Sequence, residues 1–358
     1  MKNNENKGML PDQKPSDLEI IQSYDGPPIR IMEVCGTHTH EIFKLGLRQI
    51  LPPQVTLISG PGCPVCVTPV DYIDKAIWLA EQKKVTVCTF GDLIRVPGSH
   101  ASLADARAKG AKVQMVYSPM DAYVYALEHP QEEVVFLSVG FETTTPASLL
   151  AAKKALQADL KNFSLLVANK TMPSAYQVLK DSVDVYLYPG HVNAIMGTEV
   201  CEKLAEEGVS GVVTGFTAKE ILHAFATILK NFPQGKAFFA NCYSSVVKAE
   251  GSPAARHLMD VWMEDCDTEW RGLGVIPDSG RRLREEFSSF DAEKKYEIPV
   301  MEGKANPACR CGEVLQGKCL PSDCKVFAKA CTPQHPIGAC MVSGEGACSA
   351  YFQYNIAR

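Results

Sequence analysis

The chain has 358 residues, of which 46% are apolar and 22% are charged, so it is long enough for two or three domains with hydrophobic cores. Its formal net charge is −5 and its Lys and Arg residues form no block, which argues against a nucleic-acid partner. It shows no apolar segment typical of a signal peptide and no run of about 18 apolar residues, so we expect a cytoplasmic protein with no membrane partner.

Short apolar segments alternate with helical patterns between residues 25 and 250, which predicts parallel α/β units. Strands are predicted over 29–34, 55–59, 85–90, 112–117, 133–139, 164–168, 185–188 and 211–214. Helices are predicted over 70–80, 102–110, 120–128, 147–158, 175–181, 198–207 and 219–230. The chain then continues with a predicted helix over 256–267, an irregular segment over 269–277 and charged, solvated segments up to 295.

These patterns divide the chain into four predicted parts. We expect a mobile N-terminal arm (1–24), a first Rossmann-like α/β domain (25–158) and a second one (159–250). A helical linker and a small, irregular, cysteine-rich domain make up the last part (251–358).

Cysteines are unusually frequent for a chain expected in a reducing compartment, where they more often bind metals or do redox chemistry than form structural disulfides. There are 14, of which seven lie between Cys309 and Cys348 and three lie in two loops near the N-terminus. The other four have apolar or helical surroundings, which is typical of small buried side chains; they are Cys88, Cys201, Cys242 and Cys266.

Two of the N-terminal cysteines form a C-x-x-C motif, Cys63-Pro-Val-Cys66, between a predicted strand and a predicted helix. Backbone N–H groups and the helix dipole at such a position favour the thiolate, as in dithiol/disulfide pairs. Cys35 follows another predicted strand in the same way, and is followed by Gly-Thr-His-Thr-His40. The two loops together favour a single soft-metal or redox site.

Histidines close to Cys35 are further candidates. A loop histidine is more often a hydrogen-bonded residue than a metal ligand. The short spacing from Cys35 nevertheless favours His38 over His40 as a ligand or as a proton donor beside the metal. His191, in a Tyr-Pro-Gly-His sequence, is a similar candidate with less support.

Glu142 follows the strongest predicted strand, at the edge of the sheet where ligands bind in open α/β folds. The alternative is that this segment only caps the next helix, through Thr144 or Thr145. No phosphate-binding glycine motif follows a strand, so nucleotide binding is not indicated.

The C-terminal tail has too few apolar residues for a core of its own, which indicates metal ligation or crosslinking. Its cysteine spacing is wide and uneven, which favours a [4Fe–4S] cluster over zinc knuckles. Because a cluster needs only four ligands, the spare thiols suggest a dithiol/disulfide pair that exchanges electrons with it. The seven cysteines are Cys309, Cys311, Cys319, Cys324, Cys331, Cys340 and Cys348.

Several motifs, in the same order along most of the chain, resemble the HypD family of hydrogenase maturation proteins. They lie at 32–40, 59–66, 140–144, 189–191, 270–274, 310–315, 323–327 and 340–348. The resemblance implies two Rossmann-like parallel α/β domains plus a small irregular cysteine-rich domain with a [4Fe–4S] cluster, which can reduce a neighbouring disulfide.

The resemblance also implies the function. A HypD-like protein and a small HypC-like chaperone hold a mononuclear iron while cyanide and CO are added. Cyanide comes from a HypE-like donor with HypF upstream, and the Fe(CN)₂CO unit then passes to the hydrogenase large subunit. Such a protein is a redox-active scaffold more than a turnover enzyme, and reduced, soft-ligated iron suits these ligands.

Carried onto this chain, the resemblance makes Cys35 the iron ligand, shared with a cysteine of the partner. Cys63 and Cys66 would form a redox pair or help to hold the iron. The expected cluster ligands are Cys309, Cys324, Cys331 and Cys348, and the expected accessory dithiol is Cys311 and Cys340. A second ligand set stays open, in which Cys340 replaces Cys309, and Cys319 is incidental in both.

Two other functions remain as alternatives. The first is an iron–sulfur dithiol/disulfide oxidoreductase that uses Cys63 and Cys66 without a mononuclear iron and without need of Cys35. The second is a zinc-stabilised binding module, which would be colourless and independent of redox state.

Overall fold

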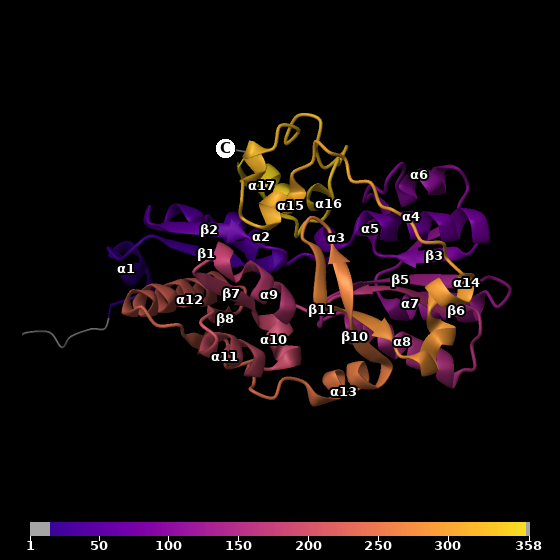
Figure 1. The fold of residues 1–358 in the computed structure, drawn as a ribbon, viewed down its shortest axis with the longest axis horizontal. Coiled ribbons are helices and arrows are strands. Elements are labelled where there is room, and N and C mark those ends of the chain that lie inside the picture. The colour runs from indigo at the N-terminus through magenta and orange to yellow at the C-terminus, as the bar shows by residue number, and fades with distance from the viewer. Residues whose placement is uncertain (1–14, 356–358) are drawn as a thin grey trace, which may run out of the picture.

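The computed structural model describes residues 15–355, which form two parallel β-sheets and a cysteine-rich tail (Figure 1). The first sheet has the strand order β2-β1-β7-β8-β9 and the second has the order β4-β3-β5-β6. Every strand pair in both sheets is parallel, which confirms the predicted α/β class. The strands are β1 (Ile29–Glu33), β2 (Val55–Ser59), β3 (Thr86–Thr89), β4 (Val113–Met115), β5 (Val134–Gly140), β6 (Phe163–Asn169), β7 (Val185–Pro189), β8 (Ser210–Thr214) and β9 (Phe239–Asn241).

Helices cover both sheets, so that a central strand such as β5 is buried along its whole length. Around the first sheet lie α1 (Asp17–Gln22), α2 (Gly36–Lys44), α9 (Pro173–Leu179), α10 (Gly190–Met196), α11 (Glu199–Glu206) and α12 (Ala218–Asn231). Around the second lie α4 (Val70–Trp78), α5 (Gly91–Ile94), α6 (Leu103–Ala108), α7 (Pro119–Glu128) and α8 (Thr145–Gln157). Within residues 15–355, no helix is long and apolar enough to cross a membrane.

The chain passes between the two sheets in a way that the predicted domain boundaries miss. β1 pairs with β7, with Ile31 opposite Val185, so the first two strands belong to the later sheet. β6 pairs with β5, with Phe163 opposite Val134, so it belongs to the earlier one. A boundary between residues 158 and 159 therefore does not separate the sheets, because local pattern identifies strands but not their distant partners.

The predicted N-terminal arm is partly a folded helix. Its residues 1–14 lie outside the described part of the chain. The segment that follows forms α1, which begins with a capping box between Ser16 and Glu19. Ile21 and Tyr24 are buried in the same core as Phe225 of α12. Residues 15–24 therefore pack on the first sheet and are not a mobile arm.

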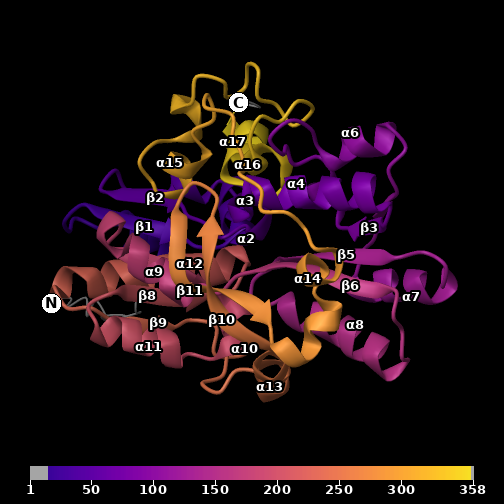
Figure 2. The same ribbon diagram turned by 45° about the vertical axis from the view of Figure 1, so that its right-hand side comes forward.

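A β-hairpin occupies residues for which a helix and irregular segments were predicted. After α13 (Pro253–Trp262), the strands β10 (Met263–Trp270) and β11 (Gly274–Leu283) pair antiparallel. Their charged residues face each other across the hairpin, as in the pairs Glu264–Arg282 and Asp265–Arg281. The predicted helix is confirmed up to Trp262. Its last part, residues 263–267, was wrong because acidic residues, which are rare in strands, are stabilised here by cross-strand arginines. The hairpin tip points toward the tail (Figures 1 and 2).

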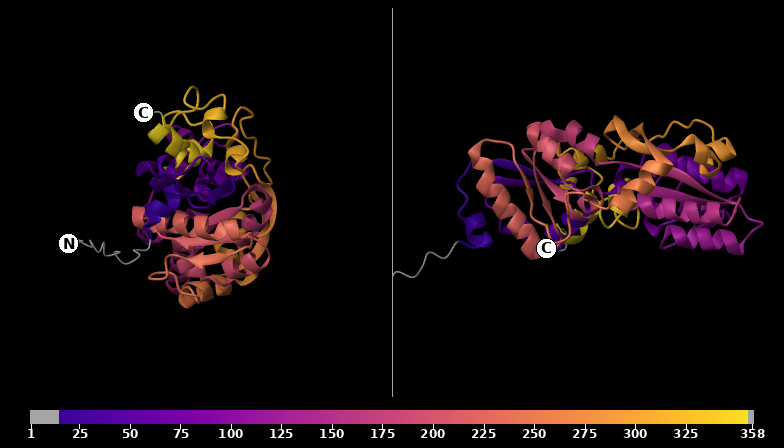
Figure 3. Two further views of the ribbon diagram at one scale, coloured as in Figure 1. Left: turned by 90° about the vertical axis from the view of Figure 1, so that its left-hand side faces the viewer. Right: turned by 90° about the horizontal axis from the view of Figure 1, so that it is seen from below.

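After α14 (Ala292–Tyr296), which packs on the second sheet, the tail has short helices connected by long loops. They are α15 (Cys311–Leu315), α16 (Ala339–Val342) and α17 (Ala347–Asn355). The buried side chains of the tail join cores that belong to the rest of the molecule. Leu315 and Cys340 pack with residues of the first sheet, and Val342 packs with residues of the second. The tail thus lies against both sheets, beside α3 (Pro64–Val67), on one side of the molecule and near the middle of its long axis (Figure 3).

Candidate functional site

Two strand-to-helix loops meet at the carboxyl edge of the first sheet. Cys35 follows β1 and is the N-cap of α2, while Cys63 follows β2 and is the N-cap of α3. β1 and β2 are parallel neighbours, so both loops leave the same edge. Gly62 lets them touch, since a Cβ at that position would lie 2.2 Å from the Cys35 backbone nitrogen. The structure therefore brings together the two loops that the sequence selected.

Cys63 and Cys66 are buried, and their sulfur atoms are 2.7 Å apart. This is closer than unbonded sulfur atoms normally lie, so a disulfide requires little movement. The Cys66 backbone N–H points at the Cys63 sulfur at 3.3 Å, as expected at a helix start. Burial, followed by the neighbouring Cys63 thiol, raises the pKa of Cys66 well above its ordinary value. The expected thiolate is therefore not favoured at Cys66 in this state.

Cys35 is also buried, and burial raises the pKa of its thiol to about 12. The backbone N–H groups of Thr37 and His38 act in the opposite direction, but they do not outweigh burial. Cys35 is therefore a neutral thiol here, and a metal ion that binds it must displace its proton.

The histidines have different places from those predicted. His191 Nε2 lies 4.0 Å from the Cys35 sulfur, whereas His38 Nε2 lies 2.9 Å from the carbonyl oxygen of Gly215. His38 is fully buried and stacks on Phe216, and burial lowers its pKa to about 4. His38 is thus a neutral imidazole that is bonded to the loop after β8 of the first sheet. His191, the weaker sequence candidate, faces Cys35.

Glu142 follows β5 of the second sheet, where it is buried and connects the loop after β5 to the loop after β6. Its Oε1 accepts hydrogen bonds from Thr171 Oγ1 at 2.6 Å and from the Met172 backbone at 2.9 Å. Burial raises the pKa of its carboxyl group, and Oε2 has no partner within residues 15–355. Thr144, the N-cap of α8, makes no side-chain capping bond. Helix capping alone therefore does not explain this segment.

Glu345 in the tail completes the site and was not selected from the sequence. Thr37 Oγ1 donates a hydrogen bond to Glu345 Oε1 at 2.7 Å, and the Glu345 carboxylate contributes to the raised pKa of both Cys35 and Cys66. Gly36 gives it room, because a Cβ at Gly36 would lie 2.4 Å from the Glu345 Cβ. The only sequence signal was its position in the Cys340–Cys348 motif, since the contact spans nearly the whole chain.

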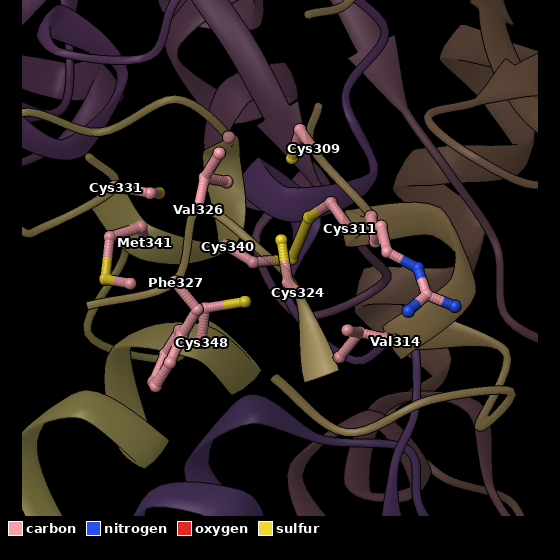
Figure 4. Close-up of a pocket in the computed structure, with 12 residues that line it drawn as sticks. Cys309, Cys311, Val314, Cys324, Val326, Phe327, Cys331, Cys340, Met341 and Cys348 are labelled. Carbon is pink, nitrogen blue, oxygen red and sulfur yellow. A yellow bond between two sulfur atoms is a disulfide. The ribbon is translucent and has the colours of Figure 1, made fainter. Parts of the chain in front are cut away.

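All the tail cysteines except Cys319 line one cavity, which Figure 4 shows in close-up. A disulfide joins Cys311 and Cys340, the pair expected as an accessory dithiol. Burial raises the pKa of the Cys348 thiol, and negative charge on the other cavity thiols raises it further. The four cysteines expected as cluster ligands all line the cavity: Cys309, Cys324, Cys331 and Cys348.

Four cysteine thiols around one cavity are the donor set that a [4Fe–4S] cluster would need. Within the described part of the chain, no three His, Cys, Asp or Glu side chains are close enough together to hold one metal ion. Structural zinc needs its ligands to converge on one ion, whereas the four thiolates of a [4Fe–4S] cluster surround a larger group. Gly338 keeps the cavity open, since a Cβ there would lie 2.4 Å from the Cys309 sulfur.

The dithiol and the tail cysteines belong to one continuous core. Cys63, Cys66, Cys311 and Cys340 are all members, and Cys309 and Cys348 pack against them. The tip of the β10–β11 hairpin closes this core from one side. The arrangement therefore places the Cys35 loop, the dithiol and a cysteine-lined cavity close to one another.

Comparison with known proteins shows the family of this chain. The HypD family model, described as "Hydrogenase formation hypA family", matches residues 16–355. The hydrogenase maturation factor HypD of Escherichia coli (strain K12) is 43% identical over 333 residues, which cover 91% of this chain and 89% of that protein. The hydrogenase maturation factor HypD of Rhodobacter capsulatus is 42% identical over 341 residues, which cover 92% and 90%. The chain therefore belongs to the HypD family.

Proposed function

We propose that this protein is a hydrogenase maturation factor, a cytoplasmic scaffold on which the Fe(CN)₂CO unit of a [NiFe]-hydrogenase is assembled. A HypC-like chaperone shares the iron, a HypE-like protein, with HypF upstream, donates cyanide, and the hydrogenase large subunit receives the product. The family and the names of the relatives support the maturation role. The observation that carries the proposal is the contact of the Cys35 loop with the dithiol loop.

In this scheme Cys35 holds the incoming iron, which is the cargo of the reaction. The buried site excludes water and leaves a soft sulfur donor, which suits low-spin iron with cyanide and CO ligands. The His191 imidazole at 4.0 Å can accept the proton that the thiol loses when the metal binds. A cysteine of the HypC-like partner supplies a second sulfur.

The tail serves the same site by electron transfer. Cys309, Cys324, Cys331 and Cys348 would hold a [4Fe–4S] cluster, which supplies one-electron redox chemistry when bound. The Cys63–Cys66 pair can exist as a disulfide or in a reduced form, which differs from it by two electrons and one or two protons. The Cys311–Cys340 disulfide lines the cavity and belongs to the same core as this pair, with which it would exchange electrons by thiol–disulfide exchange.

A second function is favoured by one specific observation. The 2.7 Å separation of the Cys63 and Cys66 sulfur atoms suits a dithiol/disulfide oxidoreductase that needs no mononuclear iron. That activity predicts turnover with a disulfide substrate and indifference to replacement of Cys35. The scaffold function predicts the reverse.

Infrared spectroscopy of the protein, purified without oxygen after co-expression with its partners, tests the scaffold. We expect bands of metal-bound cyanide and CO in the wild type and in Cys242→Ala, and none in Cys35→Ala. Cys242 is a suitable control because it bonds Thr227 in another part of the fold. A protein with an intact cluster but no such bands would reject the scaffold and favour the oxidoreductase.

A further inference from the structure

Arg271, at the tip of the β10–β11 hairpin, is a buried cation without an ion-pair partner among residues 15–355. Its side chain is 8% exposed, and Nη2 has no hydrogen-bond partner there. A buried charge is costly unless it is paired, so such a group normally serves an anion.

Two hydrogen bonds fix Arg271 against the end of the C-x-x-C helix. Its backbone nitrogen donates to the Val67 carbonyl at 2.8 Å, and Nε donates to the Thr68 carbonyl at 2.7 Å. Gly272 then lies directly against Gly312, since a Cβ at Gly272 would be 2.3 Å from the Gly312 Cα. Because Gly312 follows Cys311, the hairpin tip connects the dithiol loop to the cysteine tail.

The groups that face Arg271 identify the anion. Arg271 lines a cavity together with Cys309, and its backbone bonds the residue that follows Cys66. Negative charge on these two cysteines, and on Asp74 and Asp71, would stabilise its cation. Both carboxylates have other partners. Asp71 lies 3.3 Å from the ammonium group of Lys75, and Asp74 accepts two hydrogen bonds from Ser99, at 2.8 and 2.6 Å. The unpartnered nitrogen is therefore left for negative charge that arises at the cysteines.

We propose that Arg271 is a positioning residue that couples the Cys63–Cys66 dithiol to the cysteine-lined cavity by stabilising the charge that reduction creates on either side. The proposal rests on the redox function proposed above. Reduction of the Cys63–Cys66 disulfide breaks the S–S bond with two electrons from a one-electron carrier protein. One proton goes to Cys66, which stays a thiol, and the second electron pair remains on the Cys63 sulfur, toward which the Cys66 backbone N–H points. A cation nearby favours this singly protonated product. A reduced cluster gains negative charge in the same way, so one residue favours reduction of both.

A redox titration of the full-length holoprotein, purified without oxygen, tests the coupling. Dithiothreitol buffers supply the electrons and become cyclic disulfides, and alkylation with peptide mapping gives the reduced fraction of Cys63 and Cys66. Arg271→Gln should lower the equilibrium constant for reduction about tenfold or more, since an adjacent cation stabilises an anion by 1–3 pKa units. Tenfold corresponds to about 30 mV for this two-electron couple.

Two matched variants make the test specific. Arg271→Lys keeps the charge and should retain most of the wild-type constant. Arg284→Gln should leave it unchanged, because Arg284 lies at the other end of the hairpin, where it donates to the Asp260 carbonyl. In the same samples, the midpoint potential of the cluster, followed by electron paramagnetic resonance, should fall in Arg271→Gln and not in Arg284→Gln.

An unchanged equilibrium constant for reduction of Cys63 and Cys66 in a folded Arg271→Gln protein would overturn the proposal. So would failure of both Arg271→Gln and Arg271→Leu to fold while Arg271→Lys folds, because the charge would then serve the fold. The infrared experiment is independent of this one. A redox shift without iron–cyanide bands would reject the scaffold and keep the coupling, and bands without a redox shift would reject the coupling alone.

Discussion

Burial, more than local charge, sets the protonation of the candidate site. Desolvation is the largest cause of the raised pKa values of Cys35 and Cys66 and of the lowered pKa of His38. The helix N-termini act in the expected direction at Cys35, but their effect is smaller. Iron binding at Cys35 should therefore release a proton and become tighter as the pH rises.

Stability should depend on pH through His38. Its pKa is about 4 in the folded protein and ordinarily 6.5, so the unfolded chain takes up a proton first as the pH falls. The contribution of the neutral imidazole is complete above pH 6.5 and is lost as the pH falls toward 4. Between pH 7.5 and 4.5 the wild type should lose about 2–3 kcal/mol more unfolding free energy than His38→Gln, measured in urea. Equal losses would contradict this assignment.

Gly62 should be needed for contact between the two cysteine loops. In Gly62→Ala the new Cβ would meet the Cys35 backbone at 2.2 Å, so we expect a loss of about 1–3 kcal/mol in unfolding free energy. Gly344→Ala is the control, since a Cβ there meets nothing within 4 Å. Chemical denaturation of both variants measures the difference. A Gly62→Ala protein as stable as Gly344→Ala would show that the loops are less tightly packed than this.

At the scale of elements, two segments hold the molecule together from its margins. α1 covers the first sheet at the N-terminal end of the chain, and the β10–β11 hairpin runs from the second sheet to the tail. Neither segment forms a hydrophobic core by itself, so each depends on a few contacts with the rest of the fold.

For α1 the critical contact is Ile21, which is completely buried. Ile21→Ala should lower the unfolding free energy by about 2–5 kcal/mol, as other large-to-small changes in cores do. Leu18→Ala on the same helix should have little effect, because Leu18 is 41% exposed. Denaturant titration of the two variants distinguishes a docked helix from an arm. Similar small effects in both would restore the view of residues 15–24 as an arm.

For the hairpin the critical contact is Gly272 against Gly312. Gly272 and Gly274 both have a positive φ, +79° and +78°, but only a Cβ at Gly272 meets another backbone, at 2.3 Å. Gly272→Ala should therefore detach the tail while Gly274→Ala shows only the shared backbone strain. Hydrogen exchange over residues 306–316 should rise at least about tenfold more in Gly272→Ala. Equal exchange in the two variants would exclude this contact as the attachment.

At the scale of the whole molecule, the tail has the least hydrophobic core of its own. Its buried residues are shared among the cores of the two sheets, and its cysteines surround a cavity of their own. A segment without its own core relies on a metal group or crosslinks for its stability.

Removal of iron by a chelator under anaerobic conditions should therefore loosen the tail first. Hydrogen exchange should rise over residues 309–348 and stay low in β5, which is buried throughout. The Cys311–Cys340 disulfide should limit this opening, and a Cys311→Ser variant should open further. Equal loosening of tail and sheets would show that the metal group is not specific to the tail.

Local chemistry let the sequence determine much of this protein. Alternation of β-branched runs with helical patterns placed the strands from β1 to β8 within a few residues, because burial and periodicity are local properties. The motifs selected Cys35, the C-x-x-C pair and the tail cysteines, because the chemistry of a thiol can be inferred from the residue type alone. The sequence also contains the capping box that begins at Ser16, although a mobile arm was expected there instead of α1.

Only the tertiary structure decided how these parts meet. The decisive contacts join residues far apart in the chain. β1 pairs with β7, Glu345 lies beside Thr37, and His191 instead of His38 lies next to Cys35. The hairpin likewise brings Arg271 to the end of the C-x-x-C helix. Such contacts depend on which surfaces are buried together, and no local pattern encodes that choice. Burial likewise reversed the protonation expected from helix termini, because desolvation depends on the whole molecule around a group.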